Sequence, residues 1–179
     1  NGSYGTIDRQ LQAQASTREL ALGRLLDNDD IGLLTTQLTL QGKTDNYAAN
    51  GTIDRLDYKG YSYQHIALDG TYTRNSIAGR LTSQDPNLIT TLEGELQQTT
   101  PKNIRVKGVV ERFCPKSLNI SEKWNDAVFS TRIDGNFKAT NLNDTQGQLS
   151  ISDFHISDSA GSYHIDELKM VSGYDEGKH

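Results

Sequence analysis

The sequence lacks several features that stabilise or anchor small proteins. Its single cysteine, Cys114, excludes a disulfide within the chain. Hydrophobic residues make up only 34% of the chain. No run reaches the roughly 18 apolar residues that a membrane-spanning helix needs. The formal net charge of -5 argues against a nucleic-acid partner, which requires a basic face.

The start of the chain also lacks a targeting signal. The first residue is Asn1, and no basic stretch followed by an apolar segment comes after it. We therefore expect a mature chain or a piece of a longer protein, whose signal or anchor lies outside these residues. A length of 179 residues suits a single domain, 1–179.

Alternation of apolar and polar residues dominates what is present. Ile66, Leu68 and Tyr72 share one parity, and Asp69 and Thr71 take the other. Similar runs recur along the chain, separated by short turn-forming stretches such as 84–87 and 100–103. Such alternation predicts half-buried strands, and short connections predict that neighbours pair antiparallel. Helix is expected only as a turn near Leu25 and Leu26, and 114–124 is expected to be irregular or helical.

Glycine recurs inside these predicted strands with the parity of the apolar residues. The pattern apolar-x-Gly-x-apolar is centred on Gly70, Gly79, Gly94, Gly108 and Gly135. Glycine inside a strand marks a bend, a bulge or a close approach, and it lets a sheet curve. The glycines either leave room for a guest above the backbone or accommodate facing side chains in a sandwich.

The pentapeptide GTIDR occurs twice, at 5–9 and 51–55. We interpret each copy as the start of a strand in a repetitive sheet, with Ile7 and Ile53 pointing inward. Five residues are weak evidence for a duplication, so a series of similar strand units is the safer interpretation.

The stretch 50–87, NGTIDRLDYKGYSYQHIALDGTYTRNSIAGRLTSQDPN, resembles the TamB family of AsmA-like proteins, particularly the long versions from Bacteroidetes-type bacteria. The segments LALGRLLDNDDIG at 20–32 and RIDGNFKATNLNDTQGQLSISDF at 132–154 are similar to other segments of that family. The resemblance covers most of the chain, but the first fifteen residues and those after Gly161 carry little of it.

This resemblance implies a translocation and assembly module protein of the periplasm, attached to the inner membrane through a region outside these residues. It implies an all-β fold, an elongated, curved antiparallel meander that forms a U-shaped apolar groove, or β-taco. Such proteins are linked to lipid transport in outer-membrane biogenesis. They carry phospholipid between the two membranes and in some bacteria aid outer-membrane protein assembly with a barrel partner. The resemblance implies no enzyme activity and no cofactor.

Apolar residues of the alternating runs are the candidates for the groove lining. Phospholipid acyl chains would be bound there, and neighbouring β-segments of the same protein would extend the groove. The alternative is an ordinary sealed core, as in a β-sandwich module that binds sugar or protein, with Tyr58, Tyr61 and Tyr63 as its recognition patch. The candidate lining residues are Leu68, Tyr72, Ile77, Leu81, Leu92, Leu96, Ile104, Val106, Val110, Ile133 and Phe137.

The stretch 153–166, DFHISDSAGSYHID, is the main candidate for other chemistry. If 158–161 is a hairpin loop, His155 faces His164 and Asp153 faces Asp166, and this set of ligands suits zinc. The preferred interpretation is that the two histidines are simply exposed to solvent beside the charged residues of the hairpin, so no metal is expected. The stretch also holds serines, but outward residues of one hairpin do not converge on a pocket, and we expect no enzyme.

Overall fold

The computed structural model describes residues 2–5, 10–140 and 145–173, and it consists almost entirely of one antiparallel sheet. This confirms the predicted all-β, curved-sheet fold class. The strands are β1 (Gly2–Gly5), β2 (Gln10–Ala21), β3 (Ile31–Lys43), β4 (Asn46–Tyr58), β5 (Tyr61–Tyr63), β6 (Ile66–Tyr72), β7 (Ser76–Asp85), β8 (Leu88–Gln97), β9 (Lys102–Phe113), β10 (Val128–Ala139), β11 (Thr145–Asp158) and β12 (Gly161–Ser172).

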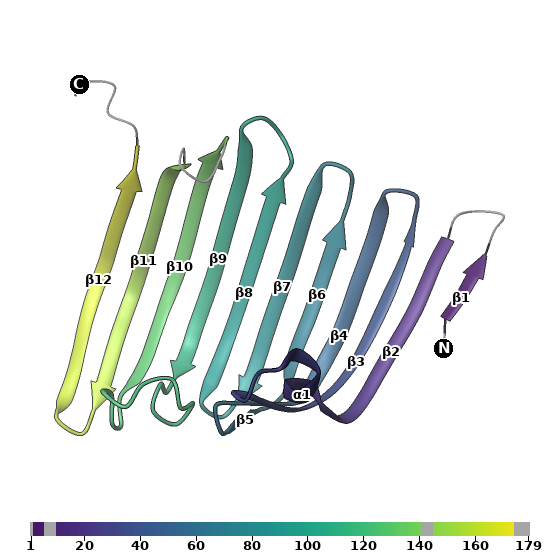
Figure 1. Cartoon of the computed structure of the whole chain (residues 1–179). Helices are drawn as coiled ribbons and strands as arrows, with labels where there is room; N and C mark the ends of the chain where they lie inside the picture. The colour runs from purple at the N-terminus through teal and green to yellow at the C-terminus, as the bar shows by residue number, and fades with distance from the viewer. Residues whose placement is uncertain (1, 6–9, 141–144, 174–179) are drawn as a thin grey trace.

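The strands follow one another across the sheet in chain order, as Figure 1 shows. Among the described strands only β5 leaves this path, and it pairs with the end of β4. The single described helix, α1 (Leu22–Leu26), joins β2 to β3. In the part of the chain that the structure describes, no helix has the length and apolar character to cross a membrane.

Local predictions mostly agree with this arrangement. Within the described residues helix is limited to the short α1, which includes Leu25 and Leu26, and residues 114–127 form an irregular segment. The second GTIDR copy lies within β4 and not at a strand start, so that prediction was wrong. Ile53 of this copy packs in the core cluster as expected, and Ile7 lies outside the described residues.

Register shifts of the sheet gather at one level, which we call the crease row. Between β2 and β3, β3 and β4, β8 and β9, and β9 and β10, the pairing shifts beside a member of this row. A bulge bends its strand and increases the local twist. Bulges at one level therefore bend the sheet on either side of β6 and β7, whose pairings have no shift. The crease row consists of Thr17, Thr36, Ile53, Ile66, Ser83, Thr90, Val110 and Thr131.

Threonine hydroxyls stabilise these shifts. Thr36 Oγ1 donates to Thr52 O at 2.7 Å, and Thr90 Oγ1 donates to Val109 O at 2.9 Å. Both threonines are buried, at 5% and 4% exposure. Because a buried carbonyl without a donor costs free energy, the hydroxyls supply hydrogen bonds where the regular pairing is interrupted.

The two faces of the sheet differ in charge. On the outer face, Asp69, Arg80, Glu93, Lys107 and Asp134 stand directly opposite one another in series, with alternating sign. Arg80 Nε lies 3.5 Å from Glu93 Oε1, and Lys107 Nζ lies 3.7 Å from Asp134 Oδ2. Exposed pairs of this kind add little stability each. They do specify register, because a slip of one residue would move the charges to the apolar face.

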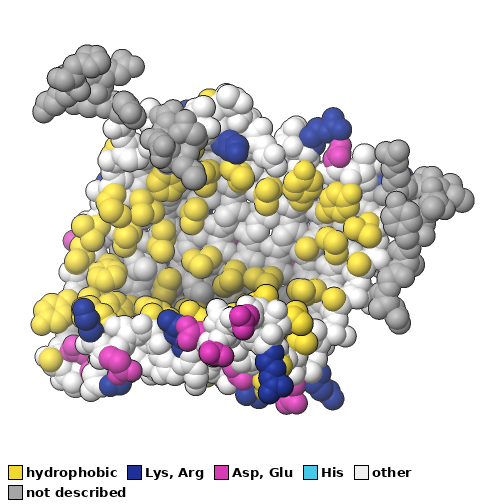
Figure 2. All heavy atoms as spheres, in the orientation of Figure 1, with side chains coloured by type: hydrophobic (Ala, Val, Ile, Leu, Met, Phe, Trp, Pro, Cys, Tyr) yellow, Lys and Arg dark blue, Asp and Glu magenta, His cyan; other side chains and the backbone are white. Residues whose placement is uncertain are grey.

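The opposite face is apolar and uncovered over much of its area. Figure 2 shows hydrophobic side chains spread across it, with charged ones mainly along its lower rim. The accessible surface is 12697 Å². A compact monomer of this mass exposes about 8,600 Å². The large excess follows from a sheet that packs against no second sheet in the described structure, so the alternative of a closed sandwich does not hold for the described residues.

The hydroxyls of the crease row give a test of its role. We expect Thr90→Val, which keeps the shape but leaves Val109 O without its donor, to lower the free energy of unfolding by about 1–3 kcal/mol. Thr91→Val, on the outer face of the same strand, is the matched control and should change stability by less than about 0.5 kcal/mol. Urea denaturation followed by circular dichroism measures both, and equal losses would contradict the assignment.

Candidate functional site, an apolar trough

Three rows of side chains cross the apolar face from β2 to β12 at successive levels, and none of their members is charged. The leucine row lies next to the crease row, the glycine row comes next, and the tyrosine row lies farthest from the crease. The leucine row is Ala15, Leu38, Gly51, Leu68, Leu81, Leu92, Gly108, Ile133, Ile151 and Leu168; the glycine row is Ala13, Leu40, Ala49, Gly70, Gly79, Gly94, Val106, Gly135, Leu149 and Met170; the tyrosine row is Leu11, Gly42, Tyr47, Tyr72, Ile77, Leu96, Ile104, Phe137, Gly147 and Ser172.

Large members of these rows stay accessible. Tyr72 and Ile77 are 42% and 43% exposed, and Leu168 and Met170 are 47% and 51% exposed. Single exposed apolar residues are common, but contiguous apolar surface of this extent is rare in monomeric proteins and marks a binding surface. We call this surface the trough.

The floor of the trough is lowest over three neighbouring strands. Gly70, Gly79 and Gly94 stand directly opposite one another on β6, β7 and β8. A Cβ atom added at Gly94 would meet no heavy atom within 4 Å, and at Gly79 it would meet only Asp69 O, at 3.5 Å. These glycines therefore face open space and not a packed neighbour. Leu81 and Leu92 flank this floor on one side, and Ile77 and Leu96 flank it on the other.

The segment 114–127, which we call the cap, covers the side of the trough nearest the crease. Leu118 of the cap is completely buried and packs with Tyr63 and Ile66. Leu68 and Leu81 of the leucine row pack against this cluster. Burial of a leucine side chain contributes about 2 kcal/mol to the free energy of unfolding. Because residues of the leucine row pack against the cluster that contains Leu118, the apolar surface that lines the trough also holds the cap in place. In Figure 1 this segment lies with α1 and β5 at the lower end of the sheet.

Asp85 fastens β5 to the turn between β7 and β8. Its carboxylate accepts hydrogen bonds from Tyr61 Oη at 2.5 Å, Gln64 N at 3.0 Å and Asn87 N at 2.9 Å. Asp85 is completely buried, so each of these donors compensates for water that the carboxylate has lost. Burial and the adjacent carboxylate raise the pKa of Tyr61 to about 12.

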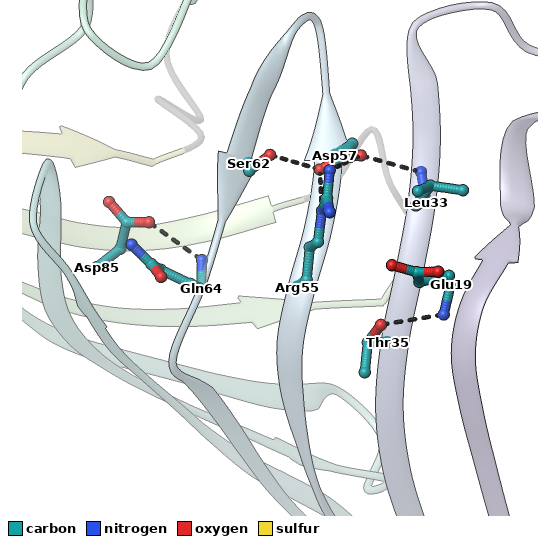
Figure 3. A network of polar contacts seen from close by, with 8 residues as sticks. All are labelled: Glu19, Leu33, Thr35, Arg55, Asp57, Ser62, Gln64 and Asp85. Carbon is teal, nitrogen blue, oxygen red and sulfur yellow. Dashed lines mark hydrogen bonds and ion pairs between the residues drawn. The ribbon is translucent and has the colours of Figure 1, made fainter.

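A second carboxylate fastens β5 and β3 to β4 (Figure 3). Asp57 accepts from Arg55 Nε at 2.8 Å and Ser62 Oγ at 2.6 Å, and from Leu33 N at 3.4 Å. The Arg55 guanidinium holds the pKa of this carboxyl below its usual value. The two carboxylates therefore have partners on several strands, which assigns them a structural role at the wall of the trough.

The structure places all the predicted lining residues on one face. Leu68, Leu81, Leu92 and Ile133 belong to the leucine row, and Val106 belongs to the glycine row. The tyrosine row contains Tyr72, Ile77, Leu96, Ile104 and Phe137, and Val110 lies in the crease row. Their binding of lipid stays a prediction.

Sequence reasoning missed part of the lining. Leu38 of β3, Ile151 of β11 and Leu168 of β12 complete the leucine row, and Leu149 and Met170 extend the glycine row. The alternation of apolar and polar residues within 31–43 and 145–172 could have indicated these lining residues. In β11 the parity of the apolar residues changes at Asp153, whose φ is 50°, and this change obscured the pattern.

The three tyrosines proposed as an exposed recognition patch do not form one. Tyr63 is 8% exposed, and its hydroxyl donates to Leu118 O. Tyr61 binds Asp85, and its ring meets that of Tyr63 edge-on with centroids 4.9 Å apart. Tyr58 packs against the same cluster. All three serve the core under the cap, because β5 folds back over the end of β4.

The predicted hairpin of β11 and β12 is present, and His155 stands directly opposite His164. Their ring centroids are 4.0 Å apart. Asp166 binds His164, but Asp153 is paired with Arg132 at 3.1 Å. Across residues 2–5, 10–140 and 145–173, no three His, Cys, Asp or Glu side chains gather as a metal-ligand group. The four residues of this disfavoured candidate site therefore do not come together in the described chain.

The raised pKa of Tyr61 predicts a loss of stability at high pH. An unfolded tyrosine ionises near pH 10, about two units below Tyr61 in the folded chain. The contribution of this raised pKa to the free energy of unfolding is therefore fully present below about pH 10, and it is lost as the pH rises to about 12. We expect the urea midpoint to fall over this interval more steeply in the wild type than in Tyr61→Phe. Tyr163→Phe, at an exposed site on β12, should retain the wild-type slope, and an unchanged slope in Tyr61→Phe would contradict the assignment.

Comparison with known proteins does not identify a function for the chain. No family model, no curated protein and no solved structure matches the chain. We therefore infer the function from the geometry of the trough.

Proposed function

We propose that this chain is a non-enzymatic segment of a lipid carrier, in which the trough holds phospholipid acyl chains. The observation that carries the proposal is the accessible, uncharged surface of the three rows, which continues from β2 to β12. Neighbouring strands lie about 4.8 Å apart, so these rows run for about 43 Å. The resemblance to TamB-type proteins supports placing this segment in the periplasm, between the inner and outer membranes.

The chemistry of the lining favours acyl chains over a peptide or a sugar. In the central strands the backbone groups are engaged in the sheet, and the side chains of the rows are mainly aliphatic or absent. Such a surface offers few directional contacts, whereas sugars and peptides need hydrogen-bond partners. A methylene group gains about 0.8 kcal/mol on leaving water for an apolar surface. Because every position along an aliphatic row is similar, a chain can slide without meeting a deep energy minimum.

The arrangement also separates the parts of a lipid. The charged residues of the outer face lie on the opposite side of the sheet, and the cap closes the side of the trough nearest the crease. The side along the tyrosine row has no such cover in the described structure, and Tyr72 and Ile77 stay exposed there. Head groups would remain in water along this open side while acyl chains occupy the floor.

Photo-crosslinking in cells tests the proposal. A photoreactive amino acid replaces Leu92, which lies in the leucine row, or Glu93, which lies on the outer face of the same strand, in the full-length protein. We expect mass spectrometry to find phospholipid attached at position 92 and not at position 93. Lipid at neither site, with the protein folded, would contradict the proposal and favour a surface that binds protein.

Filling the floor of the trough is a second test. We expect Gly79→Leu with Gly94→Leu to reduce the lipid adduct at position 92 several-fold, because the new side chains would occupy the space above the backbone. Stability should stay the same or rise by up to about 1 kcal/mol per site, since glycine weakens a strand interior.

Ala78→Leu is the matched control for these substitutions. It adds the same side chain to β7, one residue from Gly79 and on the opposite face. The adduct should be unaffected by this change. A reduction equal to that of the glycine variants would show that added bulk acts on the sheet generally and not on the trough.

A further inference from the structure

The hairpin of β11 and β12 carries a pair of histidines that neither the trough nor the cap uses. His155 and His164 stand directly opposite each other, with ring centroids 4.0 Å apart and planes tilted by 46°. Both residues are exposed, and beyond the parity change at Asp153 the half-buried Phe154 and Ile156 of β11 alternate with His155, with Phe154 packed against Phe129. The pair therefore lies on the outer face, near the edge of the sheet.

A carboxylate orients one of the two rings. His164 Nε2 lies 2.7 Å from Asp166 Oδ1, two residues along the same strand. When Nε2 carries the proton and donates it to this carboxylate, the lone pair is on Nδ1. Histidines that bind metal ions commonly donate their other ring N–H to a carboxylate in this way, which fixes the tautomer and strengthens the ligand.

We propose that His155 and His164 together bind one divalent transition-metal ion such as Zn²⁺, with Asp166 as a positioning residue. Imidazole is a preferred ligand of zinc, copper and nickel, with Zn–N distances of about 2.0–2.1 Å. Two imidazole nitrogens bound to one tetrahedral ion lie about 3.4 Å apart, a separation that rings in contact across two strands reach by small rotations. Water completes the coordination, because Asp153 is held by Arg132.

Such an ion would cross-link the last strand of the sheet to its neighbour. All the residues of β12 are exposed, and β12 pairs only with β11 in the described structure. An ion that binds the folded hairpin and not the separated strands stabilises the pairing by mass action. The metal would thus hold in place the strand that supplies Leu168 and Met170 to the trough.

Isothermal titration of the metal-free chain with ZnCl₂ tests this assignment. We expect one ion per chain for the wild type and no saturable binding for either His155→Ala or His164→Ala. Asp166→Asn should weaken binding about tenfold or more, because the carboxylate orients His164. Zinc should also raise the melting temperature of the wild type and leave that of the two alanine variants unchanged.

The two remaining histidines supply controls. His65→Ala, at the junction of β5 and β6, should retain wild-type zinc binding, and so should His179→Ala, at a position outside the described residues. Circular dichroism verifies that each variant is folded. Absence of saturable binding to the wild type, or equal binding by a folded His164→Ala variant, would overturn the proposal. Either result leaves the lipid proposal untouched, because the histidines lie on the opposite face from the trough.

Discussion

The register shifts at the level of the crease row, in the pairings of β2 to β4 and of β8 to β11, are the constraint on which the rest of the structure depends. A regular antiparallel sheet of this size would present one twisted surface. Here Thr36 and Thr90 satisfy backbone carbonyls where the pairing shifts, so the strands bend at a common level without leaving buried acceptors unpaired. The cap, β5 and α1 lie together at one end of the strands (Figure 1), and the cap packs against the apolar face beside the crease. One side of the trough is therefore closed while the other stays open.

The low proportion of hydrophobic residues, 34% of the chain, agrees with this architecture. A sheet that packs on no second sheet buries few side chains completely, and in the described chain complete burial is concentrated under the cap, around Leu118. Much of the stability must therefore come from the ladders between neighbouring strands and from half-buried side-chain contacts along the rows. The charges of the outer face limit register slips, and the apolar face stays available for a guest. The rows of the trough thus contribute both to stability and to the proposed function, whereas the charges of the outer face serve register alone.

Several predictions from single strands were sound because the side-chain period of a strand is local. Leu81, Leu92 and Leu96 were assigned to one face by parity alone, and the register places them there. The parity change at Asp153 defeated the same reasoning in β11, since a positive φ reverses the faces without any residue type that announces it. The role of Tyr63 was misjudged for a related reason. Its burial depends on Leu118, which lies 55 positions further along the chain.

The sequence by itself determined the fold class, the antiparallel meander and the sidedness of the sheet. Alternation acts between residues two apart, and short turns leave neighbouring strands little choice of partner. Only the tertiary structure decided that the apolar face stays open, because whether a second layer covers a face depends on contacts between distant segments. It also decided that Gly70, Gly79 and Gly94 lie side by side. Register between strands sets those positions, and register is fixed by packing across the whole sheet and by the bulges of the crease row.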